Sequence, residues 1–488
     1  MRERSASKAA QARARVTHPI IDSDGHIVEL MPVFLDYLRR VAGADLTLQF
    51  ESMVKQIGSL PASARHELWL ARGPFWGVPS KQTLDRMTVS LPRLLASRLD
   101  DLGLDYAVLY PTLSTIFLWA KGSSELDLVG CRAYNEFVAD QFGEFAQRLT
   151  PAALIPMYRP ADALAELEHA HGLGLKVPLL AAFVRRPIPA IVKAAPQIAS
   201  QPQFSAHCMR LDAFGIDSEY DYDPVWQKCV DLKLPITMHG FALGFTDRAS
   251  PTNYVHNHMG HFAAAQEAAC RSLFMGGVTR RFPALKFGFL EGGVGWAARL
   301  LNDIAGRWKK RSLSALRENL DPNLLDLDLA RRLYAEYADP SQQGKVEQVL
   351  AALRQVMAVD SPDSASLDEF AALGMQRLDD LQALFVDNFY FGCEADDPLV
   401  VSAFDRDANP LRARLKPLFG SDMGHWDVTD LSEPVAEAYE LLEHGRVQPD
   451  DFRAFTCDNA VELYTATNPD FFAGTVLEDY ARARSRLR

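Results

Sequence analysis

The chain of 488 residues is 48% hydrophobic and 23% charged, so it can bury a large core without disulfides or a structural metal. Its formal net charge of −12 at pH 7 argues against nucleic acid as the main partner. Because no apolar run approaches the roughly 18–20 residues that span a bilayer, we expect a protein that binds neither nucleic acid nor membrane.

The cysteines are widely scattered and include no CxxC pair, which favours buried, reduced thiols and a cytoplasmic location. The N-terminal stretch is basic and rich in alanine and serine, and it lacks the apolar core of a secretory signal. We therefore expect a disordered tail over residues 1–17 and a single domain over residues 18–488.

Short apolar runs alternate along the chain with longer segments whose apolar residues recur at helical spacing. In chain order the runs are Pro19–Val28, Tyr106–Tyr110, Leu149–Ile155, Leu175–Ala182, Pro235–His239, Leu285–Glu291, Phe389–Cys393 and Pro417–Asp422. This alternation predicts βα units and a parallel sheet. Eight such units predict an α/β protein with a distorted TIM (β/α)8 barrel.

Two segments, at about 31–91 and 301–387, are longer than ordinary loops and carry helical patterns. We interpret both as helical insertions on one barrel rather than as independent domains. Insertions of this length favour a homo-oligomer, most commonly a dimer.

Polar residues stand at the ends of three of the apolar runs. Asp24 and His26 are two positions apart, so in an extended strand they point to the same face. His239 ends the fifth run and Asp422 ends the eighth. Taken singly, each has an ordinary structural explanation, such as a core histidine or a helix N-cap. Together they predict a mixed nitrogen and oxygen site for one divalent ion, Zn²⁺ or Mn²⁺.

The sequence resembles a known family, the amidohydrolase-2 branch of the amidohydrolase superfamily. This branch is related to aminocarboxymuconate semialdehyde decarboxylase and the resorcylate-type decarboxylases. The matching motifs are IDSDGH, DRM, LDDLGLDYAVLYPT, PITMHG, FPALKFGFLEGGVGW and LFGSDMGHWD, between about Ile20 and about Thr465. The resemblance implies a distorted barrel with one metal at its C-terminal mouth. It also implies that Asp422 can move protons.

The chain departs from the family pattern at two strand ends. The first run has Asp24-x-His26 where many members have His-x-His or Glu-x-His, which leaves a carboxylate ligand in place. Glu291 stands where characterised decarboxylases of the branch place a histidine. A carboxylate there can act as a general acid or base, although a buried pair with an arginine is the plain structural alternative. His258, in the HNHMGH segment, is our candidate replacement for that histidine, and His425, in the loop after Asp422, is a candidate for contact with the substrate.

The leading hypothesis is a metal-dependent hydrolase that acts on a small carboxylated or aromatic molecule, with Asp422 as the shuttle for the proton of an activated water. The first alternative is nonoxidative decarboxylation of an aromatic or unsaturated acid. The second alternative is an inactive barrel that only binds, which should purify without stoichiometric metal. The side chains of Trp69, Phe75, Trp76 and Trp296 suit an aromatic substrate, but aromatic side chains are equally common in cores.

Overall fold

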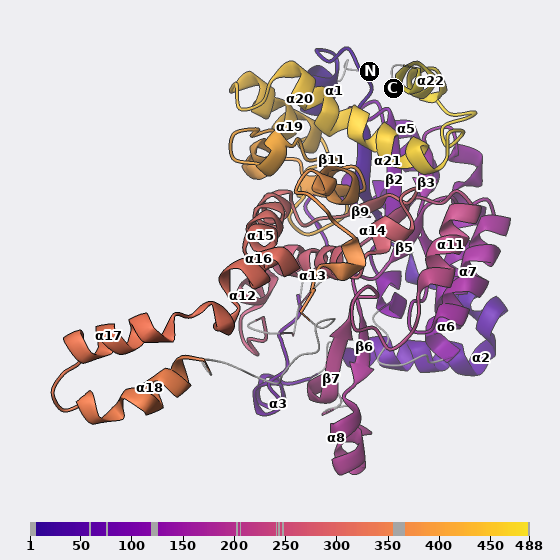
Figure 1. The fold of residues 1–488 in the computed structure, drawn as a ribbon. Helices are drawn as coiled ribbons and strands as arrows, with labels where there is room; N and C mark the ends of the chain where they lie inside the picture. Colours follow the sequence, from indigo (N-terminus) through magenta and orange to yellow (C-terminus); the bar gives the residue numbers. More distant parts are fainter. Residues whose placement is uncertain are drawn as a thin grey trace.

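The computed structural model describes residues 6–57, 60–74, 77–118, 125–201, 204, 206–240, 242, 245, 248–354 and 367–486. Its strands form two parallel sheets (Figure 1). One sheet has the order β1 (Ile21–Ile27), β2 (Tyr106–Pro111), β3 (Leu149–Pro151). The other has the order β11 (Pro417–Gly420), β10 (Phe389–Glu394), β9 (Phe287–Phe289), β8 (Ile236–Met238), β5 (Pro178–Leu180), β4 (Ala153–Leu154). The predicted α/β fold with parallel strands is confirmed.

The two sheets meet at two seams. Strands β3 and β4 are consecutive in the chain and are separated only by Ala152, so the third predicted run is one strand broken in two. At the other seam the N–H of Asp422 donates to the carbonyl of Asp24 over 3.0 Å, and the N–H of His26 donates to the carbonyl of Met423 over 3.1 Å. The strands therefore follow one another in chain order, as the predicted eight-unit architecture requires.

Each apolar run of the sequence contains one of these strands, because a parallel strand covered on both faces is apolar along its whole length. Helices lie between successive strands and after the last strand, and they cover the outside of the sheets (Figure 1). They are α5 (Pro92–Arg98), α6 (Glu125–Phe142), α7 (Pro160–Gly172), α11 (Asp223–Asp231), α13 (His261–Met275), α14 (Val278–Arg281), α15 (Gly295–Arg311), α19 (Pro434–Glu443), α20 (Pro449–Arg453) and α21 (Asn459–Thr467). Proline stands in the first turn of α5, α7, α11, α19 and α20, where its missing N–H costs no hydrogen bond.

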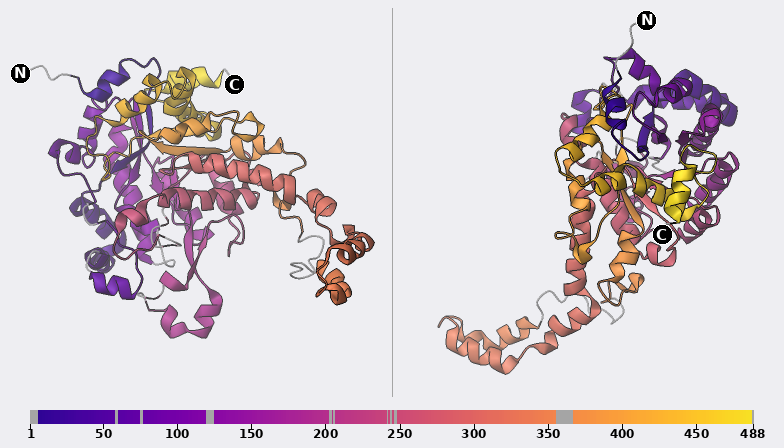
Figure 2. Two further views of the ribbon diagram at one scale, coloured as in Figure 1. Left: turned by 90° about the vertical axis from the view of Figure 1, so that its left-hand side faces the viewer. Right: turned by 90° about the horizontal axis from the view of Figure 1, so that it is seen from above.

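The two long segments contain most of their described residues in helices. The first contains α2 (Met31–Ile57), α3 (Ala62–Glu67) and α4 (Thr83–Thr88), and α2 bends at Gly43, whose φ is 78°. The second contains α16 (Leu313–Asn319), α17 (Leu327–Tyr337) and α18 (Val346–Leu353). Helices α17 and α18 project from the body of the molecule in all views (Figures 1 and 2). Residues 58–59, 75–76 and 355–366 of these segments lie outside the described residues.

An antiparallel hairpin that the sequence patterns did not predict joins β6 (Val184–Pro187) to β7 (Met209–Asp212), with α8 (Pro189–Ala194) and α9 (Pro196–Ala199) between them. Its buried Arg186 donates to the carboxylate of Asp212 over 2.8 Å and to the hydroxyl of Tyr222 over 2.8 Å. A buried arginine is stable only when it is paired in this way.

The expectation of a disordered tail over residues 1–17 does not hold for the helix α1 (Lys8–Arg13). Ala9 is fully buried, and its N–H donates to the carbonyl of Ser432 over 3.0 Å, just before α19. Arg13 forms an ion pair of 2.7 Å with Asp105. The small alanine face lets this short helix dock closely, and two further helices, α12 (Tyr254–His258) and α22 (Glu478–Ser485), complete the described set. Among the described helices, none has an apolar stretch long enough to cross a membrane.

Candidate metal centre

Buried imidazoles and carboxylates converge where four strands end. Asp24 and His26 lie within the second half of β1. His239 follows β8, and Glu291 follows β9. One ligand atom from each of these four residues lies within 4.8 Å of the others. A second, overlapping set consists of His26, Glu291, Asp422 and His425, where Asp422 follows β11. The carboxyl ends of parallel strands are the usual place for an active site in this kind of fold.

The contacts within this cluster are close but poorly aligned for hydrogen bonds. His239 Nε2 lies 2.7 Å from Glu291 Oε2, and His26 Nε2 lies 3.4 Å from both Asp24 Oδ1 and Asp422 Oδ1. These atoms are buried and make no aligned hydrogen bond with any described residue. Buried polar atoms are normally satisfied, so converging lone pairs without donors indicate a missing cation. The donor set therefore fits a divalent metal ion.

The orientation of His26 supports this interpretation. Its Nδ1 lies 3.3 Å from the carbonyl oxygen of Pro111, at the end of β2. A carbonyl oxygen can only accept, so Nδ1 carries the proton and the lone pair of Nε2 faces the cluster. Metal-binding histidines are typically held by a second hydrogen bond of this kind.

Two cluster carboxylates lie on strained backbone. Glu291 has a φ of 55° and Asp422 a φ of 49°, in the left-handed region that residues with a Cβ rarely adopt. Such conformations persist where the surrounding structure holds them, and they concentrate at functional sites. Next to Asp422, Gly420 lets β11 approach β1 so closely that an added Cβ would lie 2.8 Å from the Cβ of Asp24.

Charge interactions within the cluster shift the ionisation of its members in the absence of metal. Burial raises the pKa of Asp24 to about 7. Burial lowers the pKa of His425, but the carboxylates of Asp422 and Glu291 outweigh it and raise the pKa well above the usual value. Burial raises the pKa of Glu291, but the nearby imidazoles of His239 and His425 outweigh it, so that the pKa lies below the usual value. The site thus combines ionised and protonated groups within a few ångströms.

The structure places three of the residues predicted as ligands, Asp24, His26 and His239, in one set with Glu291, and the fourth, Asp422, in the overlapping set with His26. Glu291, predicted as a catalytic group, stands among them, and its partners are His239 and His425 rather than an arginine.

His258 belongs to neither ligand set among the described residues. Its ring lies against His261 and Trp426, with centroid separations of 4.5 and 5.4 Å. His425 lies in the second set, and its Nδ1 is 2.6 Å from Asp422 Oδ1, whereas the catalytic role of His258 stays a prediction. The sequence signal for His425 was its position three residues after Asp422.

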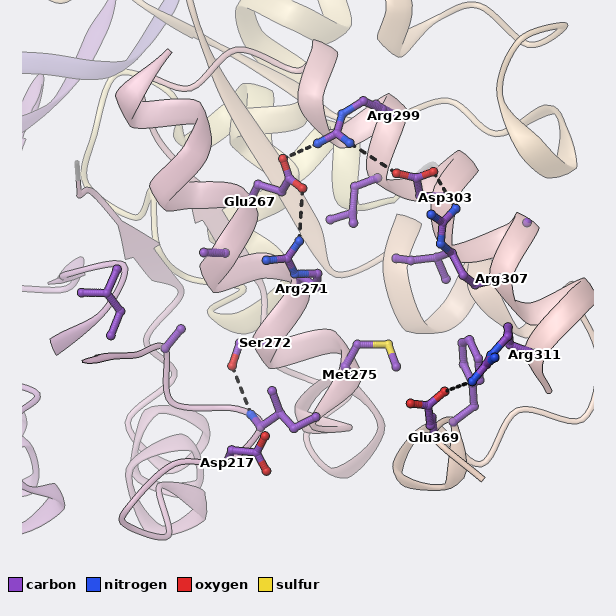
Figure 3. Close-up of a pocket in the computed structure, with 18 of the residues that line it drawn as sticks. Asp217, Glu267, Arg271, Ser272, Met275, Arg299, Asp303, Arg307, Arg311 and Glu369 are labelled. Carbon is purple, nitrogen blue, oxygen red and sulfur yellow. Dashed lines mark hydrogen bonds and ion pairs between the residues drawn. The ribbon is translucent and has the colours of Figure 1, made fainter. Parts of the chain in front are cut away.

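The aromatic residues considered for substrate binding lie elsewhere. The ring of Trp296 is buried against Phe289 and Phe391 in the core, with centroid separations of 6.0 and 5.3 Å. Trp69 is exposed on the first insertion, whereas Phe75 and Trp76 lie outside the described residues. A pocket of about 1200 Å³ also lies away from the cluster, between α13 and α15, and contains none of the cluster residues (Figure 3).

The fold and the cluster together define an α/β protein with a buried cluster that fits a divalent metal ion. A family model described as amidohydrolase matches residues 96–334. About half of the chain thus matches the family that its motifs resemble. No curated protein has a sequence that matches the chain.

Several solved structures are similar in fold. An amidohydrolase from Mycobacterium avium subsp. paratuberculosis K-10 is 15% identical, with a TM-score of 0.50 and coverage of 92% of this chain and 100% of that chain. A dihydroxybenzoic acid decarboxylase from Polaromonas sp. JS666, with bound manganese and 2-nitroresorcinol, is 14% identical, with a TM-score of 0.48 and coverage of 94% and 100%. A 5-carboxyvanillate decarboxylase from Novosphingobium aromaticivorans DSM 12444, complexed with manganese, is 13% identical, with a TM-score of 0.46 and coverage of 92% and 96%. At these identities the likeness concerns the fold and not the activity.

Proposed function

We propose that this protein is a metal-dependent carboxy-lyase of the amidohydrolase-2 type that releases CO2 from a small aromatic or unsaturated acid, within a distorted (β/α)8 barrel. The observation that carries the proposal is the contact of 2.6 Å between His425 Nδ1 and Asp422 Oδ1, beside the candidate ligands His26 and Glu291. Decarboxylation without an oxidant needs an acid that protonates the carbon left by CO2. A buried imidazole held by a carboxylate is such an acid.

Asp24, His26 and His239 would hold the ion together with Glu291, and Asp422 would reach it from the overlapping set that shares His26 and Glu291. We propose Mn²⁺ or Zn²⁺, because carboxylate and imidazole donors suit both. A divalent ion bound here supplies positive charge that attracts a substrate carboxylate and stabilises charge on a neighbouring oxygen.

The protein's own groups would then perform the proton transfer. The bond between the substrate carbon and its carboxylate breaks, the electron pair stays on that carbon, and His425 gives the carbon a proton as CO2 leaves. Asp422 holds the imidazole and stabilises its protonated form before the transfer. The side chain of His425 is 18% exposed, so solvent can return the proton after each turnover.

Hydrolysis is the second candidate, and one observation favours it. Glu291 is held ionised by His239 and His425, which gives the site a carboxylate base at the position where the family's decarboxylases carry a histidine. A base that accepts a proton from water is what hydrolysis of an ester, lactone or amide requires.

The test uses the full chain loaded with Mn²⁺ or Zn²⁺ and a panel of hydroxybenzoates, run in D2O. We expect CO2 release and one deuterium on the carbon that lost the carboxylate. His425→Gln should keep the metal and lose on the order of 10²-fold in turnover, whereas His239→Ala should lose the metal. Hydrolysis of lactones or esters without CO2 release from any acid would favour the second candidate. Metal content below about a tenth of an equivalent would leave the barrel as a binding protein.

A further inference from the structure

We propose that helices α17 and α18 form an arm that docks into a cationic groove on a second copy of this chain, so that two copies exchange arms. The arm is defined here as residues 320–354. The groove is the pocket of about 1200 Å³ between α13, α15 and β7. The proposal is independent of the proposed reaction.

The arm has one apolar side that is already covered. Its two helices face each other through Ala330 and Tyr334 on α17 and Leu350 on α18, and these residues are less exposed than their neighbours. Arg331 joins the helices through an ion pair of 2.8 Å with Glu347, and the Tyr334 hydroxyl donates to the carbonyl of Gln342 over 2.7 Å. The arm is therefore an ordered hairpin of helices.

A second apolar side of the arm is bare. Leu329, Leu333 and Tyr337 recur at a spacing of four on α17, which places them on one face of the helix, and they are exposed by 43%, 47% and 74%. Leu325, just before α17, is exposed by 41%. The body of the same chain does not cover this stripe, because the arm points away from it (Figures 1 and 2). A helix that is apolar on two sides is usually buried on both.

Charge distinguishes the arm from the groove. The arm carries six acidic side chains, Asp321, Asp326, Asp328, Glu336, Asp339 and Glu347, against the four basic side chains of Arg331, Arg332, Lys345 and Arg354. The groove carries six basic side chains, Arg210, Arg271, Arg299, Arg307, Lys310 and Arg311, against Asp217, Glu267, Asp303 and Glu369. The two surfaces are therefore opposite in sign.

Within the groove, several of these charges are already paired (Figure 3). Glu267 pairs with Arg271 and Arg299, and Asp303 pairs with Arg307 over 2.9 Å. By contrast, no carboxylate of the described residues lies within 4 Å of Arg210 or Lys310. These two cations remain available for acidic groups of a docking helix.

The shape of the groove suits an amphipathic helix. Its lining includes apolar side chains such as Ile216, Met275, Leu300, Ile304 and Phe370, surrounded by the charged rim. Helix α17 has 11 residues and so a length of about 16 Å. An apolar stripe in an apolar groove, with opposite charges at the edges, is a common mode of helix recognition. In a twofold dimer this contact forms twice, which doubles the area buried.

The test measures the molar mass of the full chain by light scattering over a range of concentrations and salt. We expect a dimer that weakens as salt screens the charges. Leu329→Glu with Leu333→Glu should raise the dimer dissociation constant by about tenfold or more. Leu48→Glu, at a position 61% exposed on α2, is the matched control and should change nothing.

A charge-reversal series identifies the occupant of the groove. Arg210→Glu with Lys310→Glu should weaken the dimer about tenfold, and adding Asp328→Lys with Glu336→Lys in the same chain should restore it. A monomer at all concentrations would overturn the proposal. A dimer whose dissociation constant does not change in the arm variants would also overturn it. The same holds for a dimer that is weakened by the arm variants but not by the groove variants, since the arms would then pair with each other.

Discussion

The carboxylate of Asp22 ties the first strand to Ser421, the residue directly before the candidate ligand Asp422. Oδ2 of Asp22 accepts from the Ser421 hydroxyl over 2.6 Å, and Oδ1 accepts from the N–H of Ser421 over 3.0 Å and from the N–H of Asp24 over 3.1 Å. Asp22 is fully buried, and burial raises its pKa to about 7. It is thus a positioning residue that holds two ligand-bearing strands at one seam.

We expect Ser421→Ala to destabilise the fold by about 1–3 kcal/mol, because it removes a donor from a buried carboxylate. The free energy of unfolding in urea measures the change. Ser341→Ala is the matched control, since its hydroxyl also donates to an aspartate, Asp339, but at an exposed position. An equal effect at both sites would contradict the role given to Asp22.

Gly420→Ala should separate the strands that carry Asp24 and Asp422. The added Cβ would lie 2.8 Å from the Cβ of Asp24, and overpacking of this kind typically costs about 1–3 kcal/mol. We expect metal affinity, measured by calorimetry, to fall at least about tenfold, which corresponds to roughly 1.4 kcal/mol.

Gly306→Ala in α15 provides the comparison for Gly420→Ala, because nothing lies within 4 Å of its added Cβ. There the substitution should leave metal affinity unchanged and stabilise the helix by about 0.5–1 kcal/mol. Unchanged metal affinity in Gly420→Ala would show that the seam tolerates the added methyl group.

Bound metal should stabilise the whole protein. An ion that binds only the folded state at about 100 times its dissociation constant adds roughly 2.7 kcal/mol. We expect Mn²⁺ or Zn²⁺ to raise the thermal unfolding midpoint of the chain, and His239→Ala to abolish this shift. His207→Ala, at an exposed histidine whose ring bonds the carbonyl of Leu68, should retain the full shift.

The stability of the protein should fall in acid partly because of His18. Burial lowers the pKa of His18 to about 4 from an ordinary value of 6.5. Its Nε2 lies 2.9 Å from the Thr456 hydroxyl, which itself donates to the carbonyl of Phe452 over 2.9 Å, so Nε2–H is the donor. Between pH 6.5 and 4 the unfolded chain binds a proton that the folded chain does not.

His18→Gln keeps a donor for Thr456 and removes this proton. Relative to that variant, the wild type should lose up to about 3 kcal/mol between pH 7 and pH 4. Urea unfolding at a series of pH values measures the difference. Parallel pH profiles for the two proteins would mean that His18 is not responsible.

The strands could be predicted from the sequence because buried parallel strands are apolar throughout, and the polar residues that end them stand out. Asp24, His26, His239 and Asp422 were identifiable for that reason. Asp22 carries the same signal, since it lies two residues before Asp24 on the same strand, but an aspartate that bonds a distant serine has no distinct local pattern.

Other features depend on contacts between distant segments, which local pattern does not reveal. The β6–β7 hairpin is built around Arg186 and Asp212, so its sequence shows charged residues where a strand usually shows apolar ones. Helix α1 has only alanine on its buried side and forms because it docks beside Ser432. The three histidines of the HNHMGH segment favoured His258 as a catalytic residue. The turn after Asp422, however, places the imidazole of His425 against the Asp422 carboxylate.

The seam between β1 and β11 also determines when the metal centre can form. His26 and Asp422 are about 400 residues apart in the chain, yet both belong to the cluster. At roughly 5–20 residues per second, a ribosome needs on the order of 20–80 s to add the second ligand after the first. During most of synthesis β11 does not yet exist, so the edge of β1 that later meets it stays unpaired. A metal ion held by both residues could therefore bind only late in synthesis, once the two ends of the chain have met.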